Sequence, residues 1–280
     1  MITKIIHEDK IQKAHKYIEK GESFVIVTHV SPDGDAIGSA LGLFHFLNAY
    51  GKENVSVIVP NDYPNFLKWM PGTKDVTIYE KYPEFSEQLI SEADVIFCLD
   101  FNDPKRIEKL ADPVLKSEAR KVLIDHHLHP VEFCNVTMSY PNISSTSEMV
   151  FRFICRMGLF DLIDKNAAEC IYTGMMTDTG AFTYNSNHPE IYTIIGELIK
   201  LGIDKDLIYR RINQVYSEGR LRLMGYVLYE KMKVHHDMQA AMIALSVDEL
   251  NRFNYQTGDT EGFVNLPLSI EGVSFSVFIR

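Results

Sequence analysis

A continuous apolar run at residues 24–27 is followed, after a polar turn, by apolar residues at helical spacing over residues 37–44. The run suits a buried strand, and the spacing suits a helix that packs on it. The turn between them carries His29, Asp33 and Asp35. Ligands of open α/β sheets bind beyond the carboxyl ends of the strands, so these side chains lie where a site is expected. For this segment alone, the alternative is an acidic helix cap beside an unrelated histidine.

Three further apolar runs lead to the same kinds of side chain. The runs are residues 95–99, 122–124 and 171–176. The residues that follow them are Asp100, then Asp125, His126 and His127, and then Asp178. A lone aspartate at a strand end is usually a helix cap, but separate caps do not explain four such ends. We therefore predict that each run is a strand and that several strand ends assemble one site.

The residue types in this predicted site indicate a metal centre. Carboxylates with a minority of imidazoles and no thiolate suit manganese, with magnesium or iron as alternatives, better than structural zinc. Crowded aspartates repel one another unless cations neutralise them, and two divalent ions would do so. The cysteines show no C-x-x-C spacing, so we expect them to be buried apolar residues.

The same residues, taken in order, resemble the motif set of the DHH phosphoesterase superfamily. The motifs are His29-x-x-x-Asp33-x-Asp35, Asp100-x-Asn102, Asp125-His126-His127 and Asp178-Thr179-Gly180. The resemblance covers residues 20–185, and residues 257–265 resemble the opening of the DHH-associated C-terminal domain. Within the superfamily the layout is most similar to the NrnA type, which combines nanoRNA degradation with dephosphorylation of pAp.

The resemblance implies two metal positions that share one carboxylate. The implied ligands are His29, Asp33 and Asp100 for one ion, and Asp35, Asp100, His126 and Asp178 for the other. Asp125 is implied to orient a neighbouring imidazole and His127 to face the substrate phosphate, and with Asp100 they form the expected catalytic set. The implied nucleophile is a metal-activated water. The expected substrate contacts are His127, Arg106, Ser145 and Arg280, with a helix N-cap as the alternative for Ser145.

The sequence departs from the family pattern in two places. Leu128-His129-Pro130 follows the DHH triplet, where the family often has a polar, asparagine-type residue. No GGGH-type substrate-binding motif precedes Arg280, and residues 273–280 alternate with the period of a strand. The sequence leaves open whether the chain is truncated there or lacks part of the usual substrate-binding half.

Strand and helix signals alternate from a first helix at residues 9–19 to residue 187, which predicts an α/β fold. We expect a mainly parallel sheet with helices on both faces, a helical connector, and a smaller mixed α/β domain that is incomplete here. The expected domains are residues 1–187 for metal binding and catalysis, 188–235 for the connector, and 236–280 for the start of the DHH-associated domain.

The charge balance limits the substrates. The net charge is −10 and the pI is near 5.5, whereas a protein that grips long duplex nucleic acid needs a basic surface. Short single-stranded RNA or small nucleotides remain suitable, because two ions supply positive charge locally. The sequence shows no membrane-spanning run and no signal peptide, and its unpaired cysteines favour the cytoplasm. A homodimer is left open.

The expected activity is therefore hydrolysis of short oligoribonucleotides, pAp or linear dinucleotides. One alternative is an inorganic pyrophosphatase or exopolyphosphatase, but the basic cluster that such pyrophosphatases carry has no counterpart closer than Arg210-Arg211. The other alternative is a non-catalytic nucleotide-binding regulator. A chain that had lost catalysis should also have lost some metal-ligand residues, but every implied ligand position carries an aspartate or a histidine.

Overall fold

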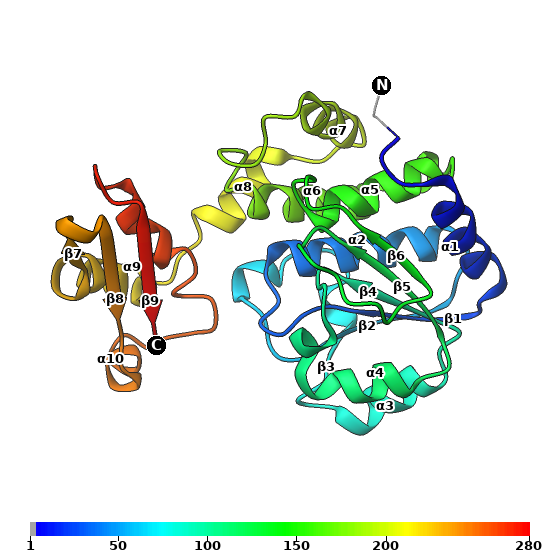
Figure 1. Ribbon diagram of the computed structural model, residues 1–280, viewed down its shortest axis with the longest axis horizontal. Helices are drawn as coiled ribbons and strands as arrows, with labels where there is room; N and C mark the ends of the chain where they lie inside the picture. Colours follow the sequence, from blue (N-terminus) through cyan, green and yellow to red (C-terminus); the bar gives the residue numbers. More distant parts are fainter. Residues whose placement is uncertain (1–3) are drawn as a thin grey trace. The chain divides into compact units, whose positions relative to one another are not determined.

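The computed structural model describes residues 4–280, which form two units (Figure 1). The first unit comprises the chain up to residue 63 together with residues 67–209, and the second comprises residues 64–66 and 210–280. The division falls inside one helix, so the helical segment predicted as a connector is shared between the two units. Each unit has a sheet of its own.

The first unit is built on a six-stranded parallel sheet with the strand order β3-β2-β1-β4-β5-β6. Its strands are β1 Ser23–Val27, β2 Asn54–Val59, β3 Val76–Ile78, β4 Val95–Leu99, β5 Arg120–Asp125 and β6 Val136–Ser139. The central strands are buried on both faces, which explains why they are continuous apolar runs rather than alternating ones. The predicted parallel sheet is confirmed.

Helices cover both faces of this sheet. They are α1 Glu8–Lys20, α2 Gly34–Ala49, α3 Pro83–Ser91, α4 Ala111–Lys116, α5 Thr146–Arg156, α6 Lys165–Asp178 and α7 Pro189–Lys200. Figure 1 shows α2, α5 and α6 on one face and α3 and α4 on the other. On the second face, Ile90 and Val114 of the helices share an apolar core with Val25, Ile96 and Leu123 of the strands. The predicted helix layers on both faces are confirmed.

The prediction that residues 171–176 form a strand is wrong, because they lie within α6. This helix begins at the N-cap Asp164, whose carboxylate accepts a hydrogen bond from the Ala167 amide. A helix buried on most sides is apolar in most directions, so a short piece of it has the same pattern as a buried strand. Asp178 therefore lies at the carboxyl end of a helix, not of a strand.

The sheet has a topological switch point between β1 and β4. From β1 the chain moves to β2 and β3 on one side, and then returns to place β4 on the other side of β1. The connections that leave β1 and β4 diverge there, which opens a crevice at the carboxyl ends of these strands. His29 and Asp100 follow β1 and β4, so both begin at this crevice.

The second unit contains the smaller mixed sheet that the sequence predicts. Its elements are α9 Glu218–Tyr226, β7 Lys233–His235, β8 Ala240–Ala244, α10 Val247–Arg252 and β9 Phe275–Ile279, and α8 Lys205–Asn213 spans the division. Strand β8 pairs antiparallel with β7 and parallel with β9. A small core of Leu223, Val227, Ile243 and Phe263 holds the unit together. Among residues 4–280, no helix has both the length and the apolar character needed to cross a membrane.

Candidate metal centre

The predicted ligands come from five parts of the first unit and meet at the switch point. His29 lies just after β1, Asp33 caps the start of α2, and Asp35 is in the first turn of that helix. Asp100 and His126 directly follow β4 and β5. Asp178, at the end of α6, completes the cluster from the helical layer. The structure thus brings all six predicted ligands into two neighbouring groups of three, and one carboxylate, that of Asp100, faces both groups.

The first group consists of His29, Asp33 and Asp100. The His29 Nε2 atom lies 3.4 Å from Asp100 Oδ2 and 3.9 Å from Asp33 Oδ2. On the other side of the ring, Nδ1 lies 2.8 Å from the carbonyl oxygen of Val30 and donates to it, so Nε2 is the nitrogen that faces the carboxylates. This Nε2 is buried and makes no hydrogen bond within residues 4–280. A buried imidazole nitrogen that faces two carboxylates fits a cation between the three groups, which would displace the proton from Nε2.

The second group consists of Asp35, His126 and Asp178. The His126 Nε2 atom lies 3.6 Å from Asp178 Oδ2 and 4.0 Å from Asp35 Oδ2. Its Nδ1 atom lies 3.2 Å from the Ile143 carbonyl oxygen, which again leaves Nε2 to face the carboxylates. Both imidazoles are therefore oriented by backbone carbonyls, as imidazoles that hold metals usually are.

Asp100 lies between the two groups. Its Oδ2 faces His29, whereas its Oδ1 lies 3.7 Å from His126 Nε2. The residue is buried and has a φ of 65°, in the left-handed region that non-glycine residues seldom occupy. Such strain persists where the surrounding structure holds a side chain in a functional direction. A carboxylate with one oxygen toward each group can bridge two cations.

Asp125 and His127 form a separate pair at the edge of the cluster. Asp125 is fully buried, and its Oδ1 lies 2.8 Å from His127 Nδ1. Its Oδ2 accepts hydrogen bonds from the His127 amide and the Ser139 hydroxyl. Both carboxylate oxygens are therefore engaged with neighbouring residues, and Asp125 belongs to none of the possible ligand groups found among residues 4–280. His127 Nδ1 also lies 3.7 Å from Asp100 Oδ1, but the shorter bond to Asp125 fixes the ring and leaves its Nε2 available.

The electrostatics show that the cluster attracts positive charge. Burial lowers the pKa of His29, but Asp100 and Asp33 outweigh burial and raise it to about 9. Burial and the charges of Asp100 and Asp33 raise the pKa of Asp178 to about 7. Burial, with Asp100 and Asp178, also raises the pKa of Asp35 well above its usual value. Carboxylates with such raised pKa values would hold protons near neutral pH. Bound cations would displace these protons and take their place.

Close packing of α2 against α6 brings Asp35 and Asp178 together, and glycines permit it. A Cβ atom on Gly38 would lie 2.6 Å from the Cys170 carbonyl oxygen. A Cβ on Gly174 would lie 1.9 Å from the Ser147 hydroxyl oxygen and 2.8 Å from Asp35 Oδ1. The sequence does not mark Gly174 as a packing residue, because residues 171–176 have the pattern of a buried strand and α6 is not recognisable there as a helix.

The predicted substrate contacts have different outcomes. Ser145 is fully buried and its hydroxyl accepts the Glu148 amide, so it is the N-cap of α5 and offers no surface to a substrate. The substrate role predicted for it is therefore replaced by the N-cap alternative. The carbonyl of Arg106 accepts a hydrogen bond from the Val30 amide, which places this residue beside the first group. Arg280 lies in the second unit, where it donates to the Thr260 hydroxyl at 2.9 Å. Roles for Arg106 and Arg280 stay predictions.

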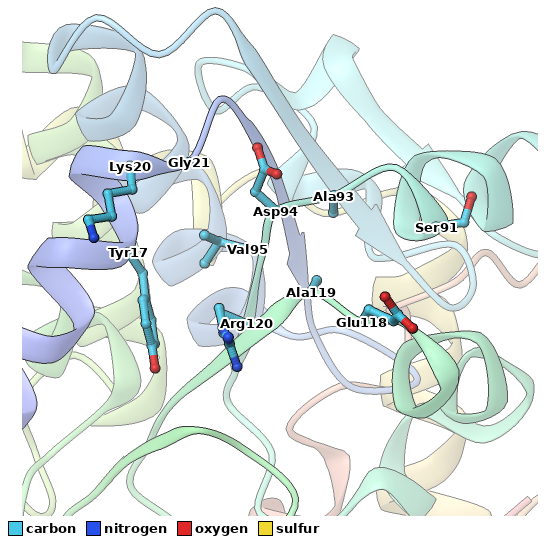
Figure 2. Close-up of a pocket in the computed structure, with 10 residues that line it drawn as sticks. All are labelled: Tyr17, Lys20, Gly21, Ser91, Ala93, Asp94, Val95, Glu118, Ala119 and Arg120. Atoms are coloured by element: carbon cyan, nitrogen blue, oxygen red, sulfur yellow. The ribbon is translucent and has the colours of Figure 1, made fainter.

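The amino-terminal edge of the sheet, opposite the ligand cluster, carries a different set of side chains. A pocket of about 500 Å³ lies there at the amino ends of β1, β4 and β5 (Figure 2). Its lining includes two basic residues, Lys20 and Arg120, and two carboxylates, Glu118 and Asp94, and Asp94 is already held by the amides of Glu22 and Ser23. The dense group of carboxylates and imidazoles is thus confined to the carboxyl edge, where α/β folds place their sites.

Comparisons with known proteins agree with this geometry. Residues 23–175 match the DHH family, N-terminal domain. The chain is 32% identical to the bifunctional oligoribonuclease and PAP phosphatase NrnA of Thermus thermophilus, over 91% of this chain and 71% of that protein. It is 24% identical to the Bacillus subtilis protein of the same name, over 92% of this chain and 77% of that protein. A solved structure of an exopolyphosphatase-related protein from Bacteroides fragilis is 60% identical with a TM-score of 0.95, covering 99% of this chain and 81% of that one.

Proposed function

The chain belongs to the DHH family, and from this premise we propose that it is a two-metal phosphoesterase that hydrolyses short oligoribonucleotides, pAp and linear dinucleotides. Hydrolysis of phosphoester bonds follows from the family, and the relatives named as oligoribonuclease and PAP phosphatase favour these substrates. The observation that carries the proposal is the pair of neighbouring ligand groups with the Asp100 carboxylate facing both.

We propose that one ion is held by His29, Asp33 and Asp100, and the other by Asp35, Asp100, His126 and Asp178. Carboxylates with two imidazoles and no thiolate favour manganese. When bound, two such ions lower the pKa of a coordinated water and neutralise the charge that develops on the phosphate. The orphaned Nε2 of His29 and the raised pKa of Asp178 support this occupancy.

The side chains that would act on the substrate beside the ions are His127, which would move a proton, and Asp125, which would orient His127. Asp125 accepts the Nδ1 proton of His127 and fixes the imidazole tautomer. The ring held in this way leaves Nε2 directed outward, where it can exchange a proton with a phosphate oxygen or the leaving oxygen. The His127 side chain is one-third exposed, which gives a substrate access to it.

The experiment that tests the proposal compares substrates on one preparation. We expect Mn²⁺-loaded protein to release phosphate from pAp and mononucleotides from pApA and a five-nucleotide RNA, and to lose these activities in EDTA. Metal analysis should find two ions per chain. Asp100→Asn should abolish turnover, while Asp112→Asn, which alters an exposed ion pair with Lys116, should leave turnover unchanged.

A second candidate is hydrolysis of phosphoanhydride bonds, because the Bacteroides fragilis structure is described as exopolyphosphatase-related. The same panel should therefore include pyrophosphate and polyphosphate. Turnover of either one faster than pAp and pApA would replace the proposed substrates and leave the metal centre in place. Absence of bound divalent ions would contradict the metal centre itself.

A further inference from the structure

Thr146 is a fully buried residue that contacts the cluster of predicted metal ligands but is not itself a predicted ligand. Its hydroxyl donates a hydrogen bond of 2.8 Å to Asp100 Oδ1. Its backbone amide donates a second bond, of 2.6 Å, to Asp35 Oδ2. One residue at the start of α5 therefore contacts the shared carboxylate and a carboxylate of the second group.

The Thr146 hydroxyl is not needed for the helix that contains it. The N-cap of α5 is Ser145, whose hydroxyl accepts the Glu148 amide. A buried hydroxyl must find a partner, and threonine in a helix commonly donates to a backbone carbonyl. Thr146 instead donates to a carboxylate that is distant in the sequence. This choice of partner separates its role from helix capping.

The segment around Thr146 is held firmly enough to act as a template. The Ser144 hydroxyl donates to Glu148 Oε2 at 2.6 Å, and Arg152 donates to Glu148 Oε1 at 2.7 Å, all three residues being buried. The Ser147 amide adds a second bond to Asp35, at 2.9 Å to Oδ1. The carbonyl of Ile143, in the same segment, faces His126 Nδ1.

We propose that Thr146 is a positioning residue that fixes the Asp100 carboxylate between the two metal positions, an inference that rests on the proposed metal centre. The hydroxyl takes one lone pair of Oδ1 and leaves the other directed to the second group, while Oδ2 remains directed to the first. Without that bond, the side chain of Asp100 can rotate and cease to serve both groups at once.

The test uses variants of the full chain that separate the hydroxyl from the backbone amide. Thr146→Val keeps the branched shape and the amide bond to Asp35 but lacks the hydroxyl. Thr146→Ser keeps the hydroxyl. Thr173→Val is the matched control, because Thr173 is equally buried and its hydroxyl donates only to the Glu169 carbonyl within α6. Calorimetric titration of metal-free protein with Mn²⁺, the paramagnetic resonance spectrum of the loaded protein, and kcat and KM on pAp are measured for each.

We expect Thr146→Val to bind one Mn²⁺ about 10–100-fold more weakly, the usual effect of losing a group that orients a ligand. Its spectrum should change from an exchange-coupled pair toward the six-line signal of a single ion, and kcat should fall with KM little changed. Thr146→Ser should restore all three, and Thr173→Val should resemble the wild type.

Wild-type affinity, spectrum and kcat in Thr146→Val would overturn the positioning role, as would equal losses in Thr173→Val. A failure of Thr146→Ser to restore the coupled spectrum would overturn it too. If the wild-type protein itself binds no divalent ion, the proposed metal centre fails, and this outcome is distinct because it appears before any variant is compared.

Discussion

At the scale of single residues, proximity alone does not assign roles within the cluster. His127 and Asp100 lie 3.7 Å apart, a distance that would allow both to hold one ion. The 2.8 Å bond between His127 Nδ1 and Asp125 engages the nitrogen that faces Asp100, so His127 is directed elsewhere. The sequence could indicate these residues through their positions after apolar runs, but only the hydrogen bonds separate a ligand from its neighbours.

His127→Asn should therefore differ in kind from Asp100→Asn. We expect His127→Asn to keep both ions and lose turnover by about 10²–10⁴-fold, because a group that moves a proton contributes that much. Asp100→Asn should lose bound metal as well as turnover. Metal analysis of the two purified variants beside their rates makes the comparison. Equal metal loss in both would mean that His127 is a ligand.

Asp178 gives a pH-dependent prediction whose sign follows from its raised pKa of about 7, against 3.8 ordinarily. Between these values the folded, metal-free protein holds a proton that the unfolded chain releases, so the free energy of unfolding falls as pH rises toward and past 7. Asp178→Asn removes this loss. We expect the variant, in EDTA, to be more stable than the wild type by up to about 4 kcal/mol at pH 8, with the advantage vanishing near pH 4.

Thermal melts of both proteins at several pH values, with and without Mn²⁺, measure this difference. Added Mn²⁺ should reverse the order at pH 8, because the wild type binds the ion with one more carboxylate. A metal-free variant that melts no higher than the wild type at pH 8 would show that Asp178 is not repelled by Asp100 and Asp33.

At the scale of elements, the strands that carry ligands were predictable, and one helix was not. Strands β1, β4 and β5 are buried on both faces and are therefore continuous apolar runs with polar residues at their ends. Residues 171–176 have the same appearance within α6 because that helix packs against α2 and α5. The start of α5 was predicted as a cap, but its bonds to Asp35 and Asp100 join parts of the chain that no local pattern connects.

The close contact of α6 with the starts of α5 and α2 predicts different effects for two glycines in helices. Gly174→Ala would place a Cβ against both Cβ and Oγ of Ser147, so rotation of the serine hydroxyl would not relieve the overlap. We expect a loss of about 1–3 kcal/mol in the free energy of unfolding, with weaker metal binding because Asp35 must shift. Gly196→Ala, in α7, meets open space and should gain about 0.5–1 kcal/mol.

Urea unfolding of both glycine variants and titration with Mn²⁺ test this prediction. Gly196→Ala controls for the general preference of helices for alanine. Wild-type stability and metal affinity in Gly174→Ala would show that α6 can move away from Ser147 and Asp35 without disturbing the cluster.

At the scale of the whole molecule, an acidic chain has to bind a phosphate substrate at a site that is itself rich in carboxylates. The net charge is −10, and carboxylates gather at the carboxyl edge of the sheet, where a phosphate substrate must bind. Composition could predict the acidic balance, but not the strand order that brings β1 and β4 together. That order depends on pairing between segments about 70 residues apart, for example Phe24 with Val95.

This charge arrangement predicts a steep dependence on substrate length. Two bound ions neutralise one or two phosphates locally, but every further phosphate of a long strand meets the field of an acidic protein. We expect kcat/KM to fall at least about tenfold between a five-nucleotide and a fifty-nucleotide RNA at low ionic strength. At 0.1 M salt, interactions between exposed charges more than about 10 Å apart are largely screened. The difference in kcat/KM between the two RNAs should therefore narrow as salt is added. A basic nuclease behaves in the opposite way, because salt weakens its hold on long strands. Equal kcat/KM for the two RNAs, or a gap that widens with salt, would indicate a basic track for long strands and contradict the preference for short substrates.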